Sequence, residues 1–188
     1  MCLLQQKFVE SLAAYSLFTH FAQVKDRHNG NIMIDSEGHI LHIDYGFFFS
    51  NSPGRNMGFE TAPFKLLQDF VSVMGGPDSD MFKYYRMLIF KGFLAARKHR
   101  EAFVTLLRIA QADSKLPCFV GGESAFDAFE KRFQRGLTDE ILMAHVDTVR
   151  SGSCCKMHCL LAMPACNACS CNACLQCLLT ISLSLLGS

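Results

Sequence analysis

Residues 25–46 read KDRHNGNIMIDSEGHILHIDYG, and this stretch decides the fold. A tight polar run, 25–30, precedes two short apolar runs, 32–34 and 40–43, which the turn residues 36–38 separate. Two short apolar runs on either side of a glycine-containing turn predict an antiparallel β-hairpin. The stretch is therefore a polar loop that leads into a hairpin, whose two outer ends lie side by side.

Helical spacing covers most of the chain around this hairpin. Apolar residues recur every three or four positions from 8 to 23, which predicts a largely buried helix. A long loop is expected at 47–64, and at least two of Phe47–Phe49 are expected to pack beneath it rather than insert into a membrane. Later helices are predicted at 64–74, at 81–110 with a break near Gly92 or Lys98, at 126–135 and at 138–149. The predicted class is α+β, mostly helical with one small hairpin.

Three polar residues have the spacing of a phosphoryl-transfer site. Asp26 precedes Asn31 by five positions, and Asp44-Tyr45-Gly46 begins thirteen positions after Asn31. A kinase needs one group that orients or deprotonates the attacking hydroxyl, and two oxygen ligands that hold Mg²⁺ on the nucleotide phosphates. A solvated turn explains Asp-x-x-x-x-Asn when it occurs alone. Asp44 at this distance, across a hairpin that brings it beside Asn31, favours the kinase interpretation.

The order Asp26-Arg27-His28, where protein kinases have His-Arg-Asp, resembles the phosphoinositide 3-/4-kinase superfamily. Lys25 and the runs HILHIDYGF (39–47) and GFETAPFKL (58–66) make the chain similar to the type III phosphatidylinositol 4-kinases, nearer their beta branch. Three later runs fit the same family: VMGG at 73–76, AARK at 95–98 and LPCF at 116–119. The resemblance covers about residues 8–150. It implies the mostly helical large (C-terminal) lobe of a protein-kinase-like fold, with the hairpin carrying the catalytic and metal residues.

The resemblance also implies roles for the loop residues. Asp26 and His28 would lie at the inositol hydroxyl, one as general base and the other as an orienting or transition-state partner. The sequence leaves open which of the two is the base. Arg27 belongs to the same catalytic group, where it is expected to brace the loop.

The hairpin residues are implied to hold the cofactors. Asn31 and Asp44 would be the ligands of Mg²⁺, with Mn²⁺ as an alternative ion. Met33 and Ile43 would form the apolar floor beneath the adenine of ATP, although simple core packing explains them almost as well. Tyr45 stands where the family usually has Phe, and its hydroxyl needs a partner if it is buried.

In this family the segment after Asp44 faces the lipid head group. Between residues 46 and 66 the basic residues are Arg55 and Lys65. A head group with additional phosphates would require a cluster of Lys or Arg, so this composition favours phosphatidylinositol itself as the substrate. The implied partner is phosphatidylinositol in a membrane surface, and the implied location is cytoplasmic and peripheral on Golgi or plasma membranes.

Composition excludes several other classes. The chain has 188 residues and a formal net charge of +1, which argues against a nucleic-acid partner held by a broad basic face. Residues 1–152 contain Cys2 and Cys118 as their cysteines, which is typical of a reducing compartment. The first residues carry Lys7 and Glu10, so no secretory signal is expected.

Two parts of the sequence depart from a complete kinase. No Gly-rich phosphate loop and no lysine-bearing strand precede Asp26, so the small N-terminal lobe is expected to be absent and the chain alone to be inactive. The domain is expected to span 1–150. The tail, 151–188, is rich in Cys and uncharged from Met157 onward. Zinc binding, palmitoylation and a tail without selected structure remain open for it.

Two other functions remain open. One is a protein-phosphorylating relative of the same superfamily, which Lys25 and the stretch 58–66 disfavour. The other is a non-catalytic interaction fragment whose Cys-rich tail binds metal or anchors to a membrane.

Overall fold

The computed structural model describes residues 3–52 and 64–144. The tail, with its cysteines, and the middle of the long loop, with Arg55, lie outside the described residues. The elements are α1 (Leu3–Ala22), β1 (Ile32–Ile34), β2 (Ile40–His42), α2 (Gln68–Val73), α3 (Asp80–Lys98), α4 (Arg100–Gln111), the 3₁₀ helix η2 (Pro117–Phe119) and α5 (Glu123–Lys131). A further helical stretch begins at residue 139. The α+β class is therefore confirmed.

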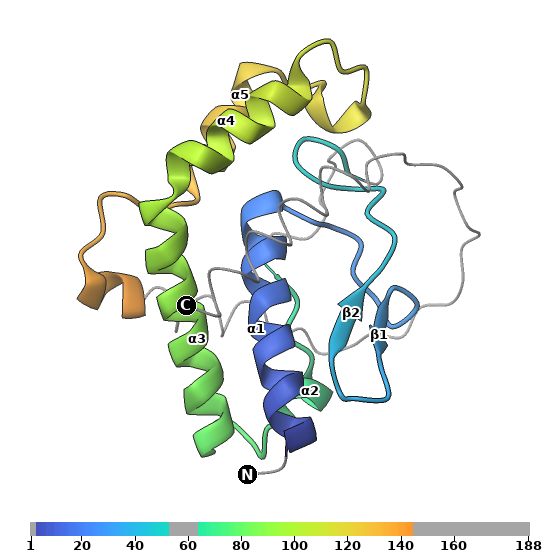
Figure 1. The fold of residues 1–188 in the computed structure, drawn as a ribbon, viewed down its shortest axis with the longest axis vertical. Coiled ribbons are helices and arrows are strands. Elements are labelled where there is room, and N and C mark those ends of the chain that lie inside the picture. The colour runs from blue at the N-terminus through green and yellow to red at the C-terminus, as the bar shows by residue number, and fades with distance from the viewer. Residues whose placement is uncertain (1–2, 53–63, 145–188) are drawn as a thin grey trace.

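The first helix, α1, is the centre of the molecule. It lies between α3 and the hairpin, and each of these packs against it (Figure 1). A helix covered on two sides must be apolar over most of its surface. Burial on α1 accordingly extends well beyond a single stripe and includes Val9, Ala13, Ala14, Leu17 and Phe18.

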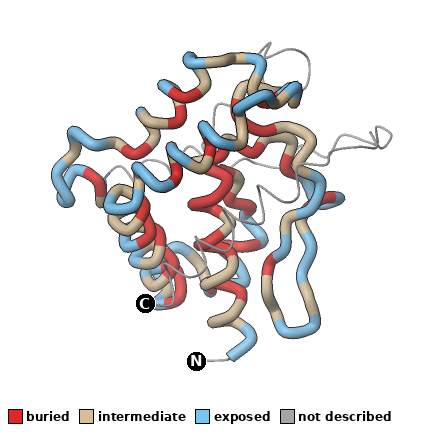
Figure 2. The backbone as a smooth tube through the Cα atoms, turned by 45° about the horizontal axis from the view of Figure 1, so that its top comes forward, coloured by how far each residue is buried: buried red, intermediate tan, exposed pale blue. Residues whose placement is uncertain are grey.

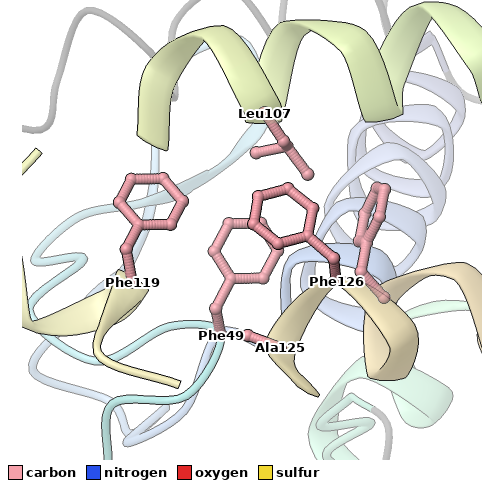
Figure 3. Close-up of a pocket in the computed structure, with 6 residues that line it drawn as sticks. Phe49, Leu107, Phe119, Ala125 and Phe126 are labelled. Atoms are coloured by element: carbon pink, nitrogen blue, oxygen red, sulfur yellow. The ribbon is translucent and has the colours of Figure 1, made fainter. Parts of the chain in front are cut away.

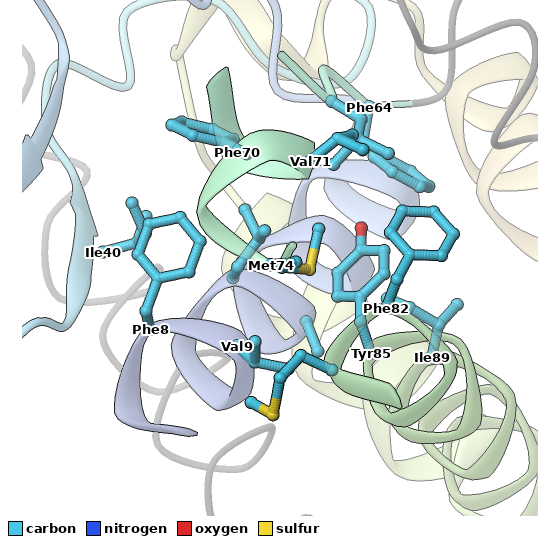
Figure 4. Packing of buried hydrophobic residues seen from close by; sticks show 14 of the residues in the cluster. Phe8, Val9, Ile40, Phe64, Phe70, Val71, Met74, Phe82, Tyr85 and Ile89 are labelled. Atoms are coloured by element: carbon cyan, nitrogen blue, oxygen red, sulfur yellow. The ribbon is translucent and has the colours of Figure 1, made fainter. Parts of the chain in front are cut away.

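Helices α1 and α3 approach each other closely where Gly92 faces Leu17. A Cβ atom placed on Gly92 would lie 2.1 Å from Cδ1 of Leu17. Nearer the start of α3, the hydroxyls of Ser16 and Tyr85 share a buried hydrogen bond of 2.8 Å. Figure 4 shows Tyr85 among the apolar side chains of this interface, beside Phe82 and Ile89. Gly92 is therefore a packing residue of a continuous helix.

The hairpin has the predicted strands and turn. Its strands are antiparallel, with Ile32 opposite His42, Met33 opposite Leu41 and Ile34 opposite Ile40. Ile40 is fully buried in the core against α1. Because side chains alternate along a strand, Met33 and Leu41 share the opposite face, which is not covered by α1.

The glycine of the turn allows the hairpin to rest on the start of α1. Gly38 adopts a φ of 90°, and a Cβ atom there would lie 2.8 Å from the carbonyl oxygen of Leu4. The turn itself is held by Asp35, whose carboxylate accepts hydrogen bonds from the backbone N–H groups of Glu37 and His39. The hairpin is thus fixed at its tip as well as along one face.

A second apolar cluster lies under α4 and α5. It contains Phe48 and Phe49 together with Phe103, Phe129 and Phe133. Figure 2 shows the buried residues running along the central helix and into the segments packed on it. Phe48 and Phe49 are buried in this cluster, which confirms the prediction that at least two of the three phenylalanines pack in the core.

Several predicted boundaries are wrong. The helix expected at 64–74 is confined to α2, and residues 64–67 before it are not helical although Phe64, Leu66 and Leu67 are buried. The break in the long helix is at His99, directly after Lys98, which confirms the second of the two predicted positions, and α3 continues through Gly92. The 3₁₀ helix η2 was not predicted, and α5 begins at Glu123, three residues before its expected start.

Candidate active site

The predicted catalytic loop joins α1 to β1. The helix ends at Ala22, and Gln23 adopts a left-handed φ of 54°, the conformation that commonly terminates helices. Asp26 and Asp44 also lie in the left-handed region, with φ values of 59° and 56°. Such backbone conformations are uncommon for residues other than glycine and concentrate at functional sites. Sequence reasoning gave no sign of this shared conformation.

Arg27 holds the loop and the Asp44 segment together. Its guanidinium donates to the carbonyl of Lys25 at 3.1 Å, to that of Ile43 at 2.8 Å and to that of Asp44. It also lies over the ring of Tyr45, 5.5 Å from the ring centre. Arg27 is 3% exposed. These contacts are those of the bracing residue that the sequence suggested.

Asn31 lies inside the loop. Its side-chain oxygen accepts the backbone N–H of His28 at 2.9 Å, and its side-chain nitrogen donates to the carbonyl of Asp26 at 2.5 Å. Its backbone carbonyl accepts the N–H of Ile43 at 3.0 Å. Asn31 therefore joins both halves of the loop to the strand that leads to Asp44.

His28 is folded back over Gly30. The backbone N–H of Gly30 donates to Nδ1 of His28 at 3.1 Å, while Nε2 lies 3.4 Å from Nδ2 of Asn31. Both contacts place a donor N–H group, that of Gly30 or that of the Asn31 side chain, against a ring nitrogen of His28. A Cβ atom on Gly30 would lie 3.0 Å from Nδ1 of His28, which explains why glycine suits this position.

The two carboxylates of the site are available to a substrate or an ion. Asp44 is exposed, and its Oδ1 accepts the backbone N–H of Gly46 at a long 3.3 Å. The carboxylate of Asp26 has no hydrogen-bond partner among the residues that the structure describes. Both acidic side chains therefore reach the surface from backbone positions that Arg27 and Asn31 hold in place.

A layer of neutral aromatic groups lies beneath Asp44. The Tyr45 hydroxyl donates to the carbonyl of His42 at 2.9 Å, which supplies the partner that this hydroxyl requires. Burial raises the pKa of Tyr45, so the hydroxyl stays protonated. The ring of His42 stacks on Tyr15 with centres 4.5 Å apart. Burial, together with the nearby charge of Arg27, lowers the pKa of His42 to about 3.

The outer face of the hairpin is apolar and exposed. Met33 is 51% exposed, Ile43 44% and Leu41 40%. Core packing therefore does not explain Met33 and Ile43, and their assignment to adenine stays a prediction. Sequence reasoning missed Leu41, although strict alternation along the strand places it on the same face as Ile43.

The predicted metal ligands suit a magnesium ion. Mg²⁺ in phosphoryl-transfer sites takes one or two protein oxygens and completes its shell with phosphate and water. The exposed carboxylate of Asp44 and the side-chain oxygen of Asn31, which has a second lone pair, can supply such ligands. Within residues 3–52 and 64–144, no group of three or more His, Cys, Asp or Glu forms a metal cage. Of the two candidate ligands, Asp44 is exposed and Asn31 is 3% exposed.

Lys65 and Lys25 both contact the loop region. Lys65 donates from Nζ to the carbonyl of Arg27 at 2.7 Å, so the later end of the predicted substrate segment reaches the catalytic loop. Lys25 donates from Nζ to the carbonyls of Phe49 and Asn51. Sequence reasoning used Lys25 as a family marker and gave it no role.

A small apolar pocket lies away from these polar groups. Figure 3 shows Phe49, Leu107, Phe119 and Phe126 converging on it from the substrate segment, α4, η2 and α5. Its lining offers no polar side chain that could orient a reacting group, so it is not the centre of the chemistry. No helix in the described part of the chain is long and apolar enough to span a membrane.

Comparisons with known proteins identify the family of the chain. The family model for phosphatidylinositol 3- and 4-kinase matches residues 2–120. The chain is 53% identical over 149 residues to phosphatidylinositol 4-kinase beta of Danio rerio, covering 79% of this chain and 18% of that relative. The proteins of the same name from Homo sapiens and Xenopus laevis are 52% identical over the same length and with the same coverage. The chain thus spans about a fifth of the length of these relatives. The resemblance drawn from the Asp26 and Asp44 motifs is confirmed, and the chain belongs to the phosphatidylinositol 3- and 4-kinase family.

Proposed function

We propose that this chain carries the catalytic loop and metal-binding hairpin of a phosphatidylinositol 4-kinase, in the large lobe of a protein-kinase-like fold. The observation that carries the proposal is the arrangement of Asp26, His28, Asn31 and Asp44 around the buried guanidinium of Arg27. The reaction moves the γ-phosphoryl group of ATP to the 4-hydroxyl of phosphatidylinositol.

The contacts favour Asp26 as the general base. Its carboxylate is not engaged by other described residues, so it can accept the proton of the 4-hydroxyl as that oxygen takes the phosphoryl group. Both ring nitrogens of His28 already face donor groups of the loop, Nδ1 the N–H of Gly30 and Nε2 the side-chain NH2 of Asn31. We therefore assign His28 the other role, that of the orienting or transition-state partner of the phosphoryl group.

Asp44 and Asn31 would hold the ion. When bound, Mg²⁺ neutralises charge on the nucleotide phosphates. Arg27 and Asn31 fix the two ligands through backbone groups. The Arg27 guanidinium donates to the carbonyl of Asp44, and the Asn31 side chain donates to the carbonyl of Asp26. The exposed face made by Met33, Leu41 and Ile43 offers an apolar surface to the adenine ring.

The substrate proposal rests on charge and on the relatives. Arg55 and Lys65 are the basic residues between 46 and 66, and Lys65 is already hydrogen-bonded to the catalytic loop. This segment therefore offers no cluster of basic residues that could bind the further monoester phosphates of a more phosphorylated head group. Phosphatidylinositol in a cytoplasmic membrane leaflet, reached by a peripheral enzyme at Golgi or plasma membranes, is the proposed substrate and setting.

The test is a lipid-kinase assay on the full-length protein with ATP and Mg²⁺. Mixed micelles containing phosphatidylinositol, phosphatidylinositol 4,5-bisphosphate or no lipid are compared, together with a generic peptide substrate. The expected product is phosphatidylinositol 4-phosphate, identified by its head group. Stronger phosphorylation of the bisphosphate, or of the peptide, would overturn the substrate assignment.

A further inference from the structure

The segment that follows Asp44 is tied at its beginning to Lys25. The backbone N–H of Lys25 donates to the carbonyl of Phe47 at 2.9 Å. Its ammonium donates to the carbonyl of Phe49 at 2.8 Å and to that of Asn51 at 3.0 Å. Lys25, which is adjacent to Asp26, therefore donates to three of the five backbone carbonyls in residues 47–51.

The conformation of this segment depends on such ties. Phe49 adopts a left-handed φ of 49°, which is unfavourable for an aromatic residue. Its N–H donates to the carbonyl of Ala22 at 2.9 Å, and its carbonyl is one of those bound by Lys25. The amide side chain of Asn51 adds a link back to the carbonyl of Gly46 at 2.9 Å. The turn is therefore held from the end of α1 and from Lys25 together.

A second lysine reaches the loop from the other end of the segment. Lys65 donates to the carbonyl of Arg27, two residues after Lys25. The part of the chain that leaves the site at Asn51 and the part that returns at Lys65 are thus attached to neighbouring positions of the catalytic loop.

The position of Lys25 is costly for a charged side chain. Burial, and then the charge of Arg132, lower the pKa of Lys25. Arg132 is half-buried and donates to the carbonyl of His20. No carboxylate pairs with Lys25 in the described parts of the chain. An ammonium group can donate three diverging hydrogen bonds from one atom, which an apolar side chain cannot replace and a planar guanidinium replaces imperfectly.

We propose that Lys25 is a positioning residue for lipid use: its ammonium sets the beginning of the substrate segment, residues 46–52, against the catalytic loop. The inference rests on the proposed function, since it concerns how the same site receives its lipid. Lys25 acts through the backbone carbonyls that it binds and does not contact the reacting atoms. Its loss therefore changes the use of lipid more than the use of nucleotide.

The kinetic test compares Lys25→Met, Lys25→Arg and Asn51→Ala in the full-length protein. Lys25→Met is expected to raise the KM for phosphatidylinositol in mixed micelles about fivefold or more, while the KM for ATP and the lipid-independent hydrolysis of ATP change less than about twofold. Lys25→Arg is expected to restore only part of the loss. Asn51→Ala keeps the Lys25 ammonium but removes the hydrogen bond from the Asn51 side chain to the carbonyl of Gly46. It is expected to raise the KM for phosphatidylinositol as well. The matched control is Lys91→Met, at an exposed position of α3. It should leave the KM for phosphatidylinositol, the KM for ATP and the hydrolysis of ATP unchanged.

The response to salt separates positioning from charge attraction. Attraction of an anionic lipid weakens as ionic strength rises, whereas direct hydrogen bonds of a half-buried ammonium do so much less. The ratio of lipid KM values between Lys25→Met and the unchanged protein should therefore stay constant with salt. A ratio that falls toward one at high salt, or full recovery in Lys25→Arg, would overturn the positioning role.

Amide hydrogen exchange tests the same tie without any activity. In Lys25→Met the amides of Phe49 and Asn51 should exchange about tenfold faster or more, while those of α3 keep their protection. Unchanged exchange at Phe49 and Asn51 would overturn the inference even if the kinase assignment holds. Faster exchange in a protein that does not phosphorylate phosphatidylinositol would instead contradict the proposed function.

Discussion

Gly30 leaves little space around His28, for which we propose a role in phosphoryl transfer. A methyl group added there would lie 3.0 Å from Nδ1 and 3.1 Å from Cε1 of His28. We expect Gly30→Ala to displace the ring and lower kcat about tenfold to a hundredfold, because small displacements of catalytic groups have effects of this size. Stability should change by less than about 1 kcal/mol, since Gly30 has an ordinary backbone conformation. Steady-state kinetics and urea unfolding measure the two effects.

Gly136→Ala is the control for this substitution, because a Cβ atom on Gly136 meets nothing within 4 Å. Gly136→Ala should leave both kcat and the unfolding free energy unchanged. Full activity in Gly30→Ala would show that the observed position of the His28 ring is not needed for transfer.

His42 predicts a specific loss of stability in acid. Its pKa is lowered from 6.5 to about 3, so between these values the unfolded chain binds a proton that the folded chain does not. Stability therefore falls as the pH drops below 6.5. From pH 7 to about pH 4.5, this group should cost roughly 2 kcal/mol of unfolding free energy. Urea unfolding at the two pH values measures it.

His42→Phe should remove that part of the pH dependence. Phenylalanine keeps the stacking on Tyr15, and Nδ1 of His42 is buried without a hydrogen-bond partner among the described residues. His99→Gln, at an exposed position, is the comparison and should leave the acid loss intact. An equal acid loss in the His42→Phe variant and the unchanged protein would refute the explanation.

At the residue scale, spacing alone was enough to find the polar set. The Asp26 and Asp44 motifs predicted the residues that Arg27 and Asn31 bring together. The left-handed backbone at both aspartates and the role of Lys25 were not predictable, because each depends on contacts between segments that local sequence does not encode.

At the scale of elements, the contact between α1 and α3 depends on Gly92. Alanine is the better helix former by about 1 kcal/mol. Its Cβ atom would nevertheless lie 2.1 Å from Cδ1 of Leu17, which is buried. We expect Gly92→Ala to lower the unfolding free energy by about 1–2 kcal/mol, since overpacking outweighs helix propensity.

A double mutant tests whether this contact is the cause. Leu17→Ala alone should cost about 2–4 kcal/mol, and combined with Gly92→Ala the loss should be smaller than the sum of the two. Additive losses would mean that the clash is not between these residues.

The hairpin face gives a prediction on nucleotide binding. Met33→Ser should raise the KM for ATP several-fold and change the unfolding free energy by less than about 0.5 kcal/mol, because the side chain is half exposed. Ile34→Ser is the matched control. Ile34 is 58% exposed but points to the other face of the strand, so its loss should not affect ATP. Equal effects on ATP in both variants would contradict the assignment of that face.

Helices and strands were predictable where a single spacing of apolar residues dominates the segment. The helix before the loop and both strands of the hairpin were found from their apolar spacing. The helix expected from residue 64 is shorter because the segment before Gln68 is tied to the catalytic loop by Lys65, with Phe64 and Leu66 buried on either side of it. Tertiary contacts overrode local periodicity there.

At the scale of the whole molecule, one helix supports both segments that carry the two acidic residues. Helix α1 supports the loop that carries Asp26, and it also supports the hairpin that ends at Asp44. Arg27 and Asn31 connect these two parts through backbone groups. We propose that the two aspartates have different roles, Asp26 as the base and Asp44 as a ligand of the ion.

The most direct test measures Mg·ATP binding and single-turnover transfer to phosphatidylinositol in full-length Asp26→Asn and Asp44→Asn. Both variants should lose transfer by about 10²-fold to 10⁴-fold. Asp44→Asn should also bind Mg·ATP about tenfold more weakly, whereas Asp26→Asn should bind it within about twofold of the unchanged protein. Near-normal transfer by Asp26→Asn, or equal loss of Mg·ATP binding in both variants, would contradict the account.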